Sequence, residues 1–361
     1  MAALITRQVG DLTELCVFDH AGNVQLPAGT MDPGEVPVES AAREAWEETG
    51  LPHLELVGEV AVLDELTRNP GWPDVALMVT PHEGCPVTRG HAVQVLERTG
   101  TSVTIANDYF GWRGEVPATC VERDVSRHVF HLRTTTPTPN EWWVLTPDGG
   151  GSQWRCRWIP LDDRSQVHPS QQAWIDVARE AIAPGPPVPA SEPLPAGADE
   201  VYDAYNEVRL VMRAVDGAPP GEAPRGSSYA VCVTADGDTV LVNEDGRPAW
   251  GLPGGRPEPG ESAEETLTRE VLEEACARVV EHELLLTSCD SFLDTERRVT
   301  ARCETPIYWA RVELDAWAPQ FEKTARHLVP IADLATVLRW EVPLYLAIQE
   351  RALAAESRRA R

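Results

Sequence analysis

The sequence predicts an α/β protein built from two similar halves, and three observations support this prediction. A length of 361 residues exceeds what one ordinary core needs. A proline-rich segment divides the chain near its middle. On each side of it, short strand-like runs, a Leu-Pro-x-Gly turn and a charged helix follow one another in the same order.

The proline-rich segment 183–198 reads APGPPVPASEPLPAGA. Its proline density excludes a helix or a central strand and favours an extended spacer. We therefore expect a first domain over residues 1–183, a linker over 184–198 and a second domain over 199–361. Helices are predicted near the end of each half, over Gln171–Ile182 and Val342–Ala355.

Short apolar runs that predict strands open each half, namely Leu15–Phe18 in the first and Tyr229–Val233 and Thr239–Val242 in the second. The turns that follow have the sequences LPAG over residues 26–29 and LPGG over 252–255. Glycine allows the sharp turn that brings backbone groups close to a bound ion or phosphate.

A charged helix is predicted after each turn. The helix signals are the capping pair of Ser262 with Glu265 in the second half, and Pro37 at the first helical position in the first half. The two helices carry the stretches REAWEETGL (43–51) and REVLEEACA (269–277).

Three glutamates on each helix recur at spacings i, i+3 and i+4, which places them on one helical face. They are Glu44, Glu47 and Glu48 in the first half, and Glu270, Glu273 and Glu274 in the second. Like charges at these spacings repel by about 0.2–0.5 kcal/mol per exposed pair, so a bound cation explains their clustering. Carboxylate oxygens favour a hard ion, Mg²⁺ or Mn²⁺.

Both stretches fit the spacing G-x5-E-x7-R-E-U-x-E-E-x-G-U, where U is a bulky apolar residue, and this pattern resembles the Nudix box. A charged solvent-facing helix is the alternative, but it explains neither the glycine-proline turn nor the repeat. The resemblance implies two α/β/α sandwiches, each a mixed sheet flanked by helices. It also implies metal ligands, structural pairs and catalytic groups. The metal ligands are the six glutamates with Gly29 and Gly255, the pairs are Glu35 with Arg43 and Glu261 with Arg269, and the catalytic candidates are Glu47, Glu273 and Glu322.

Three positions depart from the family pattern, and none removes a glutamate. Ala45 and Ala277 are small where a bulky apolar residue is expected. Cys276 replaces the glycine that usually takes a left-handed conformation after such a helix, at a cost of about 1 kcal/mol unless the turn changes. A weaker candidate for a distant carboxylate in the first half is Glu141.

The first half is longer than the second. It spans 110 positions from Gly50 to Pro160, whereas the second spans 54 from Cys276 to Pro330. The additional 56 residues predict an insertion at about 66–124, and their alternating apolar residues broken by glycines predict short strands. This β-rich insertion resembles a bacterial SH3-like barrel; an elaborated hairpin over the first site is equally compatible with the pattern.

The formal charge of −26 disfavours nucleic acid and anionic membranes as partners. No apolar run approaches the ~18 residues of a membrane helix, no signal peptide is recognised, and the eight cysteines form no CxxC pair. We expect a cytoplasmic protein whose oligomeric state is open, and whose acidic site handles phosphates through a bound cation.

The function implied by the resemblance is metal-dependent hydrolysis of a diphosphate linkage in a nucleoside diphosphate linked to another moiety, at two potential active sites. The alternative is one catalytic domain with a nucleotide-sensing or scaffold partner. A DNA-binding regulator is disfavoured by the charge. The sequence does not identify the small nucleotide-type substrate.

Overall fold

The computed structural model describes the chain except residues 21, 33, 65–74, 109, 123–125, 147–152, 183, 190, 205, 245–249, 320–322, 339–340 and 360–361. The described strands form one large mixed sheet and one small antiparallel sheet, which confirms the α/β class. The chain divides into two compact units, 1–138 with 157–190 and 139–156 with 191–361. Two separate sandwiches are not shown, because the division between the units falls inside a single strand, β12 (Gln153–Pro160).

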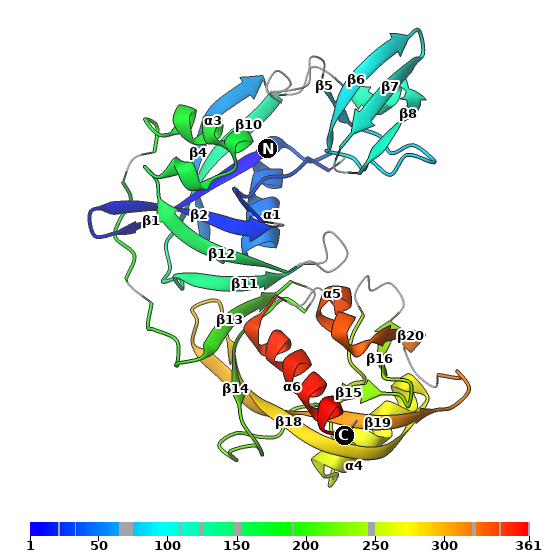
Figure 1. Cartoon of the computed structure of the whole chain (residues 1–361). Coiled ribbons are helices and arrows are strands. Elements are labelled where there is room, and N and C mark those ends of the chain that lie inside the picture. The colour runs from blue at the N-terminus through cyan, green and yellow to red at the C-terminus, as the bar shows by residue number, and fades with distance from the viewer. Residues whose placement is uncertain are drawn as a thin grey trace. The chain divides into compact units, whose positions relative to one another are not determined.

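Unit 1 contains a mixed sheet in the order β12-β2-β1-β10-β4, with β3 beside β2 (Figure 1). β1 pairs with β10 in parallel, whereas β1–β2 and β10–β4 are antiparallel. Its elements are β1 (Ala2–Val9), β2 (Leu12–His20), β3 (Asn23–Gln25), α1 (Pro37–Thr49), β4 (Leu54–Asp64), β10 (Ser126–Thr134), the end of β12, the short η2 (Arg164–Gln166) and α3 (Pro169–Ala178).

Helix α3 packs on this sheet through an apolar cluster. Trp174 and Ile175 are buried with Leu4 of β1 and Leu15 of β2. Helix α1 contacts β1, β10 and β4, and buries its small residues Ala41 and Ala45 completely. Alanine at position 45 therefore allows a close approach of the helix to the sheet.

The predicted β-rich insertion is confirmed as a five-stranded antiparallel sheet in the order β8-β7-β6-β5-β9. Its own apolar core includes Met78, Val93 and Ile105. The elements are β5 (Val75–Met78), β6 (Ala92–Thr99), β7 (Ser102–Asn107), β8 (Trp112–Pro117), η1 (Ala118–Cys120) and β9 (Val121–Glu122).

Unit 2 has the strand order β20-β16-β15-β19-β18-β14-β13-β11, with β17 beside β15. The pairs β15–β19 and β11–β13 are parallel. Its elements are β11 (Glu141–Leu145), β13 (Ala198–Asp203), β14 (Val208–Val215), β15 (Ser228–Val233), β16 (Asp238–Glu244), β17 (Gly254–Gly255), α4 (Ala263–Ala275), β18 (Ala277–Leu293), β19 (Val299–Leu314), β20 (Lys323–Pro330), η3 (Ile331–Asp333), α5 (Leu334–Leu338) and α6 (Pro343–Arg359).

Alternate residues of β15 face two different helices of unit 2. Val231 and Val233 pack in the cluster that contains α6, whereas Ala230 and Cys232 pack in the cluster that contains α4. This period of two is what a strand buried on both faces requires. Helices therefore cover both faces of this part of the sheet (Figure 1).

The predicted repeat is visible in the topology. The order β12-β2-β1-β10-β4 in the first half corresponds to β20-β16-β15-β19-β18 in the second, with the charged helix placed before β4 and before β18. β12 and β20 have eight residues each and end at Pro160 and Pro330, so Gln153 and Lys323 are the first residues of the two corresponding strands.

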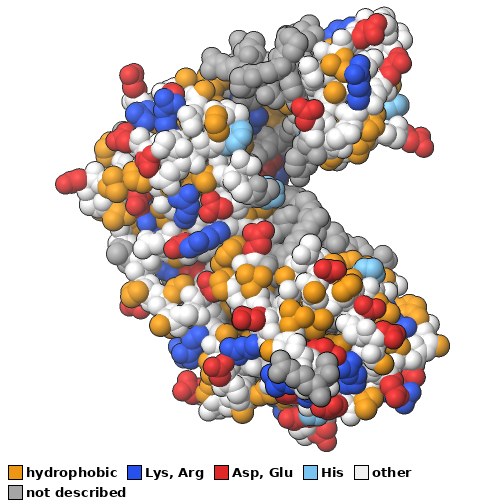
Figure 2. Space-filling model, viewed as in Figure 1, with side chains coloured by type: hydrophobic (Ala, Val, Ile, Leu, Met, Phe, Trp, Pro, Cys, Tyr) orange, Lys and Arg blue, Asp and Glu red, His pale blue; other side chains and the backbone are white. Residues whose placement is uncertain are grey.

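Acidic and basic side chains are interspersed on the surface that Figure 2 shows. No helix in the described part of the chain is both long and apolar enough to cross a bilayer. All eight cysteines are free thiols.

Candidate active site

The two charged helices begin and end where the sequence predicts. α1 starts at Pro37 and ends at Gly50, whose φ of 61° is left-handed. α4 starts after Ser262, whose Oγ accepts from the Glu265 backbone N at 3.1 Å, while the Glu265 carboxylate accepts from the Ser262 N at 2.7 Å. The helix ends at Cys276, which keeps the left-handed conformation with φ 48°.

The Cys276 turn is stabilised from outside the helix. The Cys276 Sγ accepts a hydrogen bond from the Ala318 backbone N at 3.4 Å, and the side chain is buried. Arg326 of β20 donates to the carbonyls of Ala275 at 2.8 Å and of Cys276 at 3.1 Å. These contacts offset the cost of a side chain in this conformation.

Arg43 draws the carboxylates of the first helix together. Its guanidinium donates to Glu35 at 2.7 Å, to Glu47 at 2.8 Å and to Glu44 at 3.0 Å. The hydrogen bond from Arg43, followed by that from the Asp32 backbone, lowers the pKa of Glu35 to about 2. Arg43 therefore ties the loop before the helix to the glutamate face.

Arg269 repeats this arrangement in the second half. It donates to Glu261 at 2.8 Å, to Glu273 at 2.9 Å and to Glu270 at 3.0 Å. The hydrogen bond from Arg269, followed by that from the Glu258 backbone, lowers the pKa of Glu261 to about 2. The same three contacts thus hold both loops.

The glycine of each turn lies directly against the first glutamate of each triplet. A Cβ built on Gly29 would lie 1.9 Å from the Glu44 Oε1, and one built on Gly255 would lie 2.4 Å from the Glu270 Oε1. Space rather than backbone conformation therefore requires glycine at both positions. Burial, the largest cause, raises the pKa of Glu270 above its ordinary value.

The last glutamate of each triplet accepts a backbone hydrogen bond from the turn. Glu48 accepts from the Ala28 N at 2.8 Å, and Glu274 accepts from the Gly254 N at 2.9 Å. Glu274 is 6% exposed and also lies 3.1 Å from the Lys323 Nζ. Burial raises the pKa of Glu274 more than these two partners lower it.

The donor set fits Mg²⁺ or Mn²⁺ by its chemistry, since its carboxylate oxygens lie beside a turn where only glycine leaves room for them. Within the described ranges, no three acidic, His or Cys side chains are assembled as a ligand set. The glutamates instead bond to Arg43, Arg269, Lys323 and backbone nitrogens. The Gly29 carbonyl accepts from the Met1 nitrogen at 2.7 Å.

The two carboxylates predicted far from the charged helices along the chain are Glu322 and Glu141. Glu322 lies outside the described residues. Glu141 forms an ion pair with Arg155, and both side chains are about half exposed. Glu141 belongs to unit 2 and α1 to unit 1, and both distant carboxylates stay predictions.

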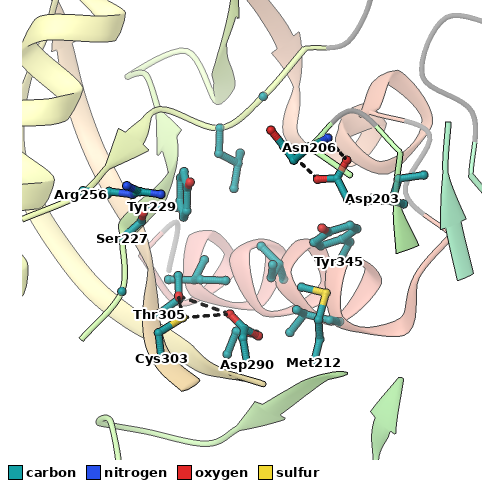
Figure 3. A pocket seen from close by; sticks show the side chains of 18 of the residues that line it. Asp203, Asn206, Met212, Ser227, Tyr229, Arg256, Asp290, Cys303, Thr305 and Tyr345 are labelled. Carbon is teal, nitrogen blue, oxygen red and sulfur yellow. Dashed lines mark hydrogen bonds between the residues drawn. The ribbon is translucent and has the colours of Figure 1, made fainter. Parts of the chain in front are cut away.

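A cavity of about 870 Å³ in unit 2 adjoins the second site, and the sequence did not predict it. Arg256 and Lys323, which contact the Arg269 and Glu274 side chains respectively, are part of its wall. Aromatic side chains also line it, including Tyr229 and Tyr345 (Figure 3).

A buried polar cluster forms one side of this cavity. Asp290 of β18 accepts hydrogen bonds from Ser288 at 2.5 Å, from Thr305 at 3.4 Å and from the Cys303 Sγ at 3.9 Å (Figure 3). Burial raises the Asp290 pKa above its ordinary value. Asn206 donates to Asp203 at 2.7 Å at another part of the wall. The cavity therefore combines aromatic surface with fixed polar groups.

A loop of the β-rich insertion contacts the turn of the first site. Arg89 donates to the Met31 carbonyl at 2.6 Å. A Cβ built on Gly90 would lie 2.4 Å from the Thr30 Oγ1, so the two loops are in close contact. The insertion thus lies against the turn that precedes α1.

The NUDIX domain family matches residues 3–87 and 224–345, together more than half of the chain. A putative 8-oxo-dGTP diphosphatase of Bacillus subtilis (strain 168) is 45% identical over 47 residues, which are 13% of this chain and 32% of that protein. The chain therefore spans about a third of the length of this curated relative.

Solved structures of similar proteins include the pyrophosphohydrolase BsRppH of Bacillus subtilis, at 21% identity over 42% of this chain and 94% of that chain, with a TM-score of 0.34. A NUDIX hydrolase from Nitrosomonas europaea has 21% identity over 37% and 90%, with a TM-score of 0.30. The NUDIX domain of Shewanella oneidensis NrtR, solved with ADP ribose, has 24% identity over 38% and 92%, with a TM-score of 0.29.

Proposed function

Because the chain belongs to the NUDIX domain family, we propose that it hydrolyses a diphosphate linkage in a nucleoside diphosphate joined to another moiety. Both halves are proposed as active sites that use Mg²⁺ or Mn²⁺. The observation that supports two sites is the repetition of one contact set: a glycine against the first glutamate, an arginine on two glutamates, and a backbone nitrogen on the last.

The proposed ligands in the first site are Glu44, Glu47 and Glu48 with the Gly29 carbonyl. Those in the second are Glu270, Glu273 and Glu274 with the Gly255 carbonyl. When bound, the cations supply an activated water and neutralise charge on the diphosphate. Glu47, Glu273 and Glu322 are the candidates for the general base that removes a proton from that water.

Arg43 and Arg269 have a positioning role in this proposal. Each holds two glutamates and the loop carboxylate, Glu35 or Glu261, so the spacing of the carboxylates is set before any cation arrives. Holding the carboxylates near one another reduces the cost of assembling a ligand set when a cation binds, as pre-organisation generally does.

The cavity of unit 2 is the proposed place for the nucleoside part of the substrate. It is large enough for a small organic ligand and combines aromatic side chains with a few polar groups, as ligand sites usually do. Its wall reaches Arg256 and Lys323 beside the second site, so a bound molecule can extend from the cavity to the glutamates.

The second candidate function is one catalytic half with a nucleotide-sensing partner. The contact of the insertion with the turn at Met31 favours it, because this contact belongs to the first half alone. An insertion in contact with a site can change conformation when a ligand binds there, and this change can be passed to a partner.

The two proposals are separated by Glu48→Gln and Glu274→Gln, which keep the side-chain shape and remove one charge. Hydrolysis of ADP-ribose, dinucleoside polyphosphates, oxidised nucleotides and nucleotide sugars is measured with Mg²⁺ and with Mn²⁺. If both halves are enzymes, each single variant should lose activity on some substrates or part of the rate on a shared one. The double variant should then be folded and inactive. Loss of all activity in one single variant and none in the other supports the sensor.

A further inference from the structure

The chain contains a single lysine, Lys323; the other 30 of its 31 basic residues are arginine. This lysine begins strand β20 and is largely buried, with its side chain 17% exposed. Its Nζ lies 3.1 Å from the Glu274 Oε1. The sole ammonium side chain of the protein therefore lies on a carboxylate of the second glutamate triplet.

The other oxygen of this carboxylate is already committed, because the Glu274 Oε2 accepts from the Gly254 backbone N at 2.9 Å. Glu274 is the most buried glutamate of its triplet, and a buried carboxylate without a counter-charge is costly. Lys323 supplies that counter-charge in the absence of a cation. A cation that binds the Oε1 must displace the ammonium.

Lysine and arginine differ in how firmly they hold a carboxylate. The guanidinium of Arg269 holds Glu261 with a planar fork of its Nε and Nη2 and donates from its Nη1 to Glu270 and Glu273. The ammonium of Lys323 is instead a compact charge on a flexible stem. An ammonium can leave one oxygen for another partner without breaking a bidentate geometry. The ammonium of Lys323 can therefore be exchanged for another cation at Glu274.

A destination for the displaced ammonium is adjacent. Lys323 and Arg256 line the part of the cavity next to the glutamates, where the phosphates would lie if the proposed function holds and the nucleoside fills the rest of the cavity. Arg256 is held near the box through its carbonyl, which accepts from Arg269 at 2.9 Å. Lys323 therefore borders both the carboxylate that a cation needs and the space that an anionic substrate needs.

We propose that Lys323 is an exchangeable counter-ion of the second site, which neutralises Glu274 until a divalent cation binds and then binds the phosphate of the substrate. This inference rests on the proposed function for the identity of the anion. Its first step, the exchange at Glu274, concerns cation binding alone.

The first half contains no lysine that could act as such a counter-ion. The first residue of β12, the strand that corresponds to β20, is Gln153, whose Oε1 accepts from the backbone nitrogens of Glu341 at 2.8 Å and Val342 at 3.2 Å. A glutamine carries no charge to exchange. The proposal therefore predicts that the two sites differ in how cation and anion binding are linked.

A single lysine makes the exchange directly measurable in the full-length wild-type protein. An N-hydroxysuccinimide ester acylates the deprotonated amine of lysine with release of N-hydroxysuccinimide, so an ammonium held by a carboxylate reacts slowly. Mass spectrometry of the peptide with Lys323 gives the rate at that one side chain. We expect Mn²⁺ alone to raise the rate several-fold, because the ion pair with Glu274 is lost. Adding methylene diphosphonate with Mn²⁺ should lower it again.

Variants test the same exchange by calorimetry in a Glu48→Gln background, where the first site is disabled. Lys323→Gln should bind Mn²⁺ several-fold more tightly and, with Mn²⁺ present, bind methylene diphosphonate about ten-fold more weakly, as the loss of one charge-assisted hydrogen bond predicts. Lys323→Arg keeps the charge in a fork and should weaken Mn²⁺ binding. Circular dichroism verifies that both variants are folded.

A modification rate that does not respond to Mn²⁺ overturns the proposal, even if every variant unfolds, since that measurement uses the wild-type chain. Unchanged Mn²⁺ affinity in folded Lys323→Gln also overturns it. If Mn²⁺ changes the rate but no diphosphate compound is hydrolysed, the exchange stands and the proposed function fails. If hydrolysis occurs with an unresponsive Lys323, only the exchange fails.

Discussion

Replacing Gly255 with alanine tests the geometry of the second site most directly. The added Cβ would lie 2.4 Å from the Glu270 Oε1 and 2.5 Å from its Cδ, whereas ordinary contacts begin at 3.4 Å. The carboxylate must therefore move by about 1 Å. Metal–ligand distances tolerate changes of about 0.2 Å, so Glu270 should no longer reach a cation held by Glu273 and Glu274.

The expected result is a large functional loss with a small change in stability. A displacement of this size lowers the rate about 100-fold. The displaced atoms are the end of a flexible side chain, and the lost contact with Arg269 is a partly exposed pair, so the free energy of unfolding should fall by no more than about 1 kcal/mol. Mn²⁺ titration and hydrolysis are measured in the Glu48→Gln background.

Gly251→Ala is the matched control, because a Cβ at Gly251 meets no atom within 4 Å and its φ is not in the left-handed range. This variant should keep the Mn²⁺ affinity of its parent. In the first site, Gly29→Ala demands a larger shift of Glu44, about 1.5 Å from a starting distance of 1.9 Å. A folded Gly255→Ala protein with unaltered Mn²⁺ affinity and a rate within about two-fold of its parent would refute this reasoning.

Three other predictions use thermal or denaturant unfolding. Cys276→Gly should leave the free energy of unfolding unchanged or raise it by up to about 1 kcal/mol, because the removal of backbone strain at φ 48° offsets the lost thiol contact. A decrease of more than about 1 kcal/mol would show that the thiol contact dominates. The Glu261 pKa is about 2 in the folded protein against 4.5 ordinarily, so its pair with Arg269 stabilises above pH 4.5 and is lost as the pH falls toward 2. The difference in unfolding midpoint between wild type and Glu261→Gln should shrink over that window, and a constant difference contradicts the assigned cause. A fragment 139–361 should melt cooperatively and above a fragment 198–361; equal midpoints would show that residues 139–156 add nothing to unit 2.

The box was predictable from the sequence because its information is local. The spacing of Glu270, Glu273 and Glu274 fixes one helical face, and the capping pair at Ser262 fixes where that face begins. The position of the helix end at Cys276 was also predictable, whereas the sequence left open whether this residue is left-handed, as it is, or the turn changes shape. Local rules leave little freedom over such short separations.

The cavity was not predictable for the opposite reason. Its polar cluster depends on the register between β18 and β19, which places Asp290 opposite Cys303. Other parts of the wall come from Asp203 in β13 and Tyr345 in α6. No spacing along the chain relates these residues, because side chains from separate strands meet only when the sheet has formed. The exchange partner of Glu274 was hidden in the same way, although a lone lysine is visible in the composition.

The segment 139–156 is distant in sequence from the rest of its compact unit. It precedes the proline-rich segment, yet belongs to unit 2. Trp143 of β11 pairs in parallel with Val201 of β13, and the Gln153 side chain accepts from the backbone before α6. Proline content reports where the chain is extended, whereas a folding unit is defined by which strands share hydrogen bonds. Parallel strand pairs join segments that are far apart in sequence. We therefore propose that unit 2 completes its sheet with β11, a strand that precedes the linker.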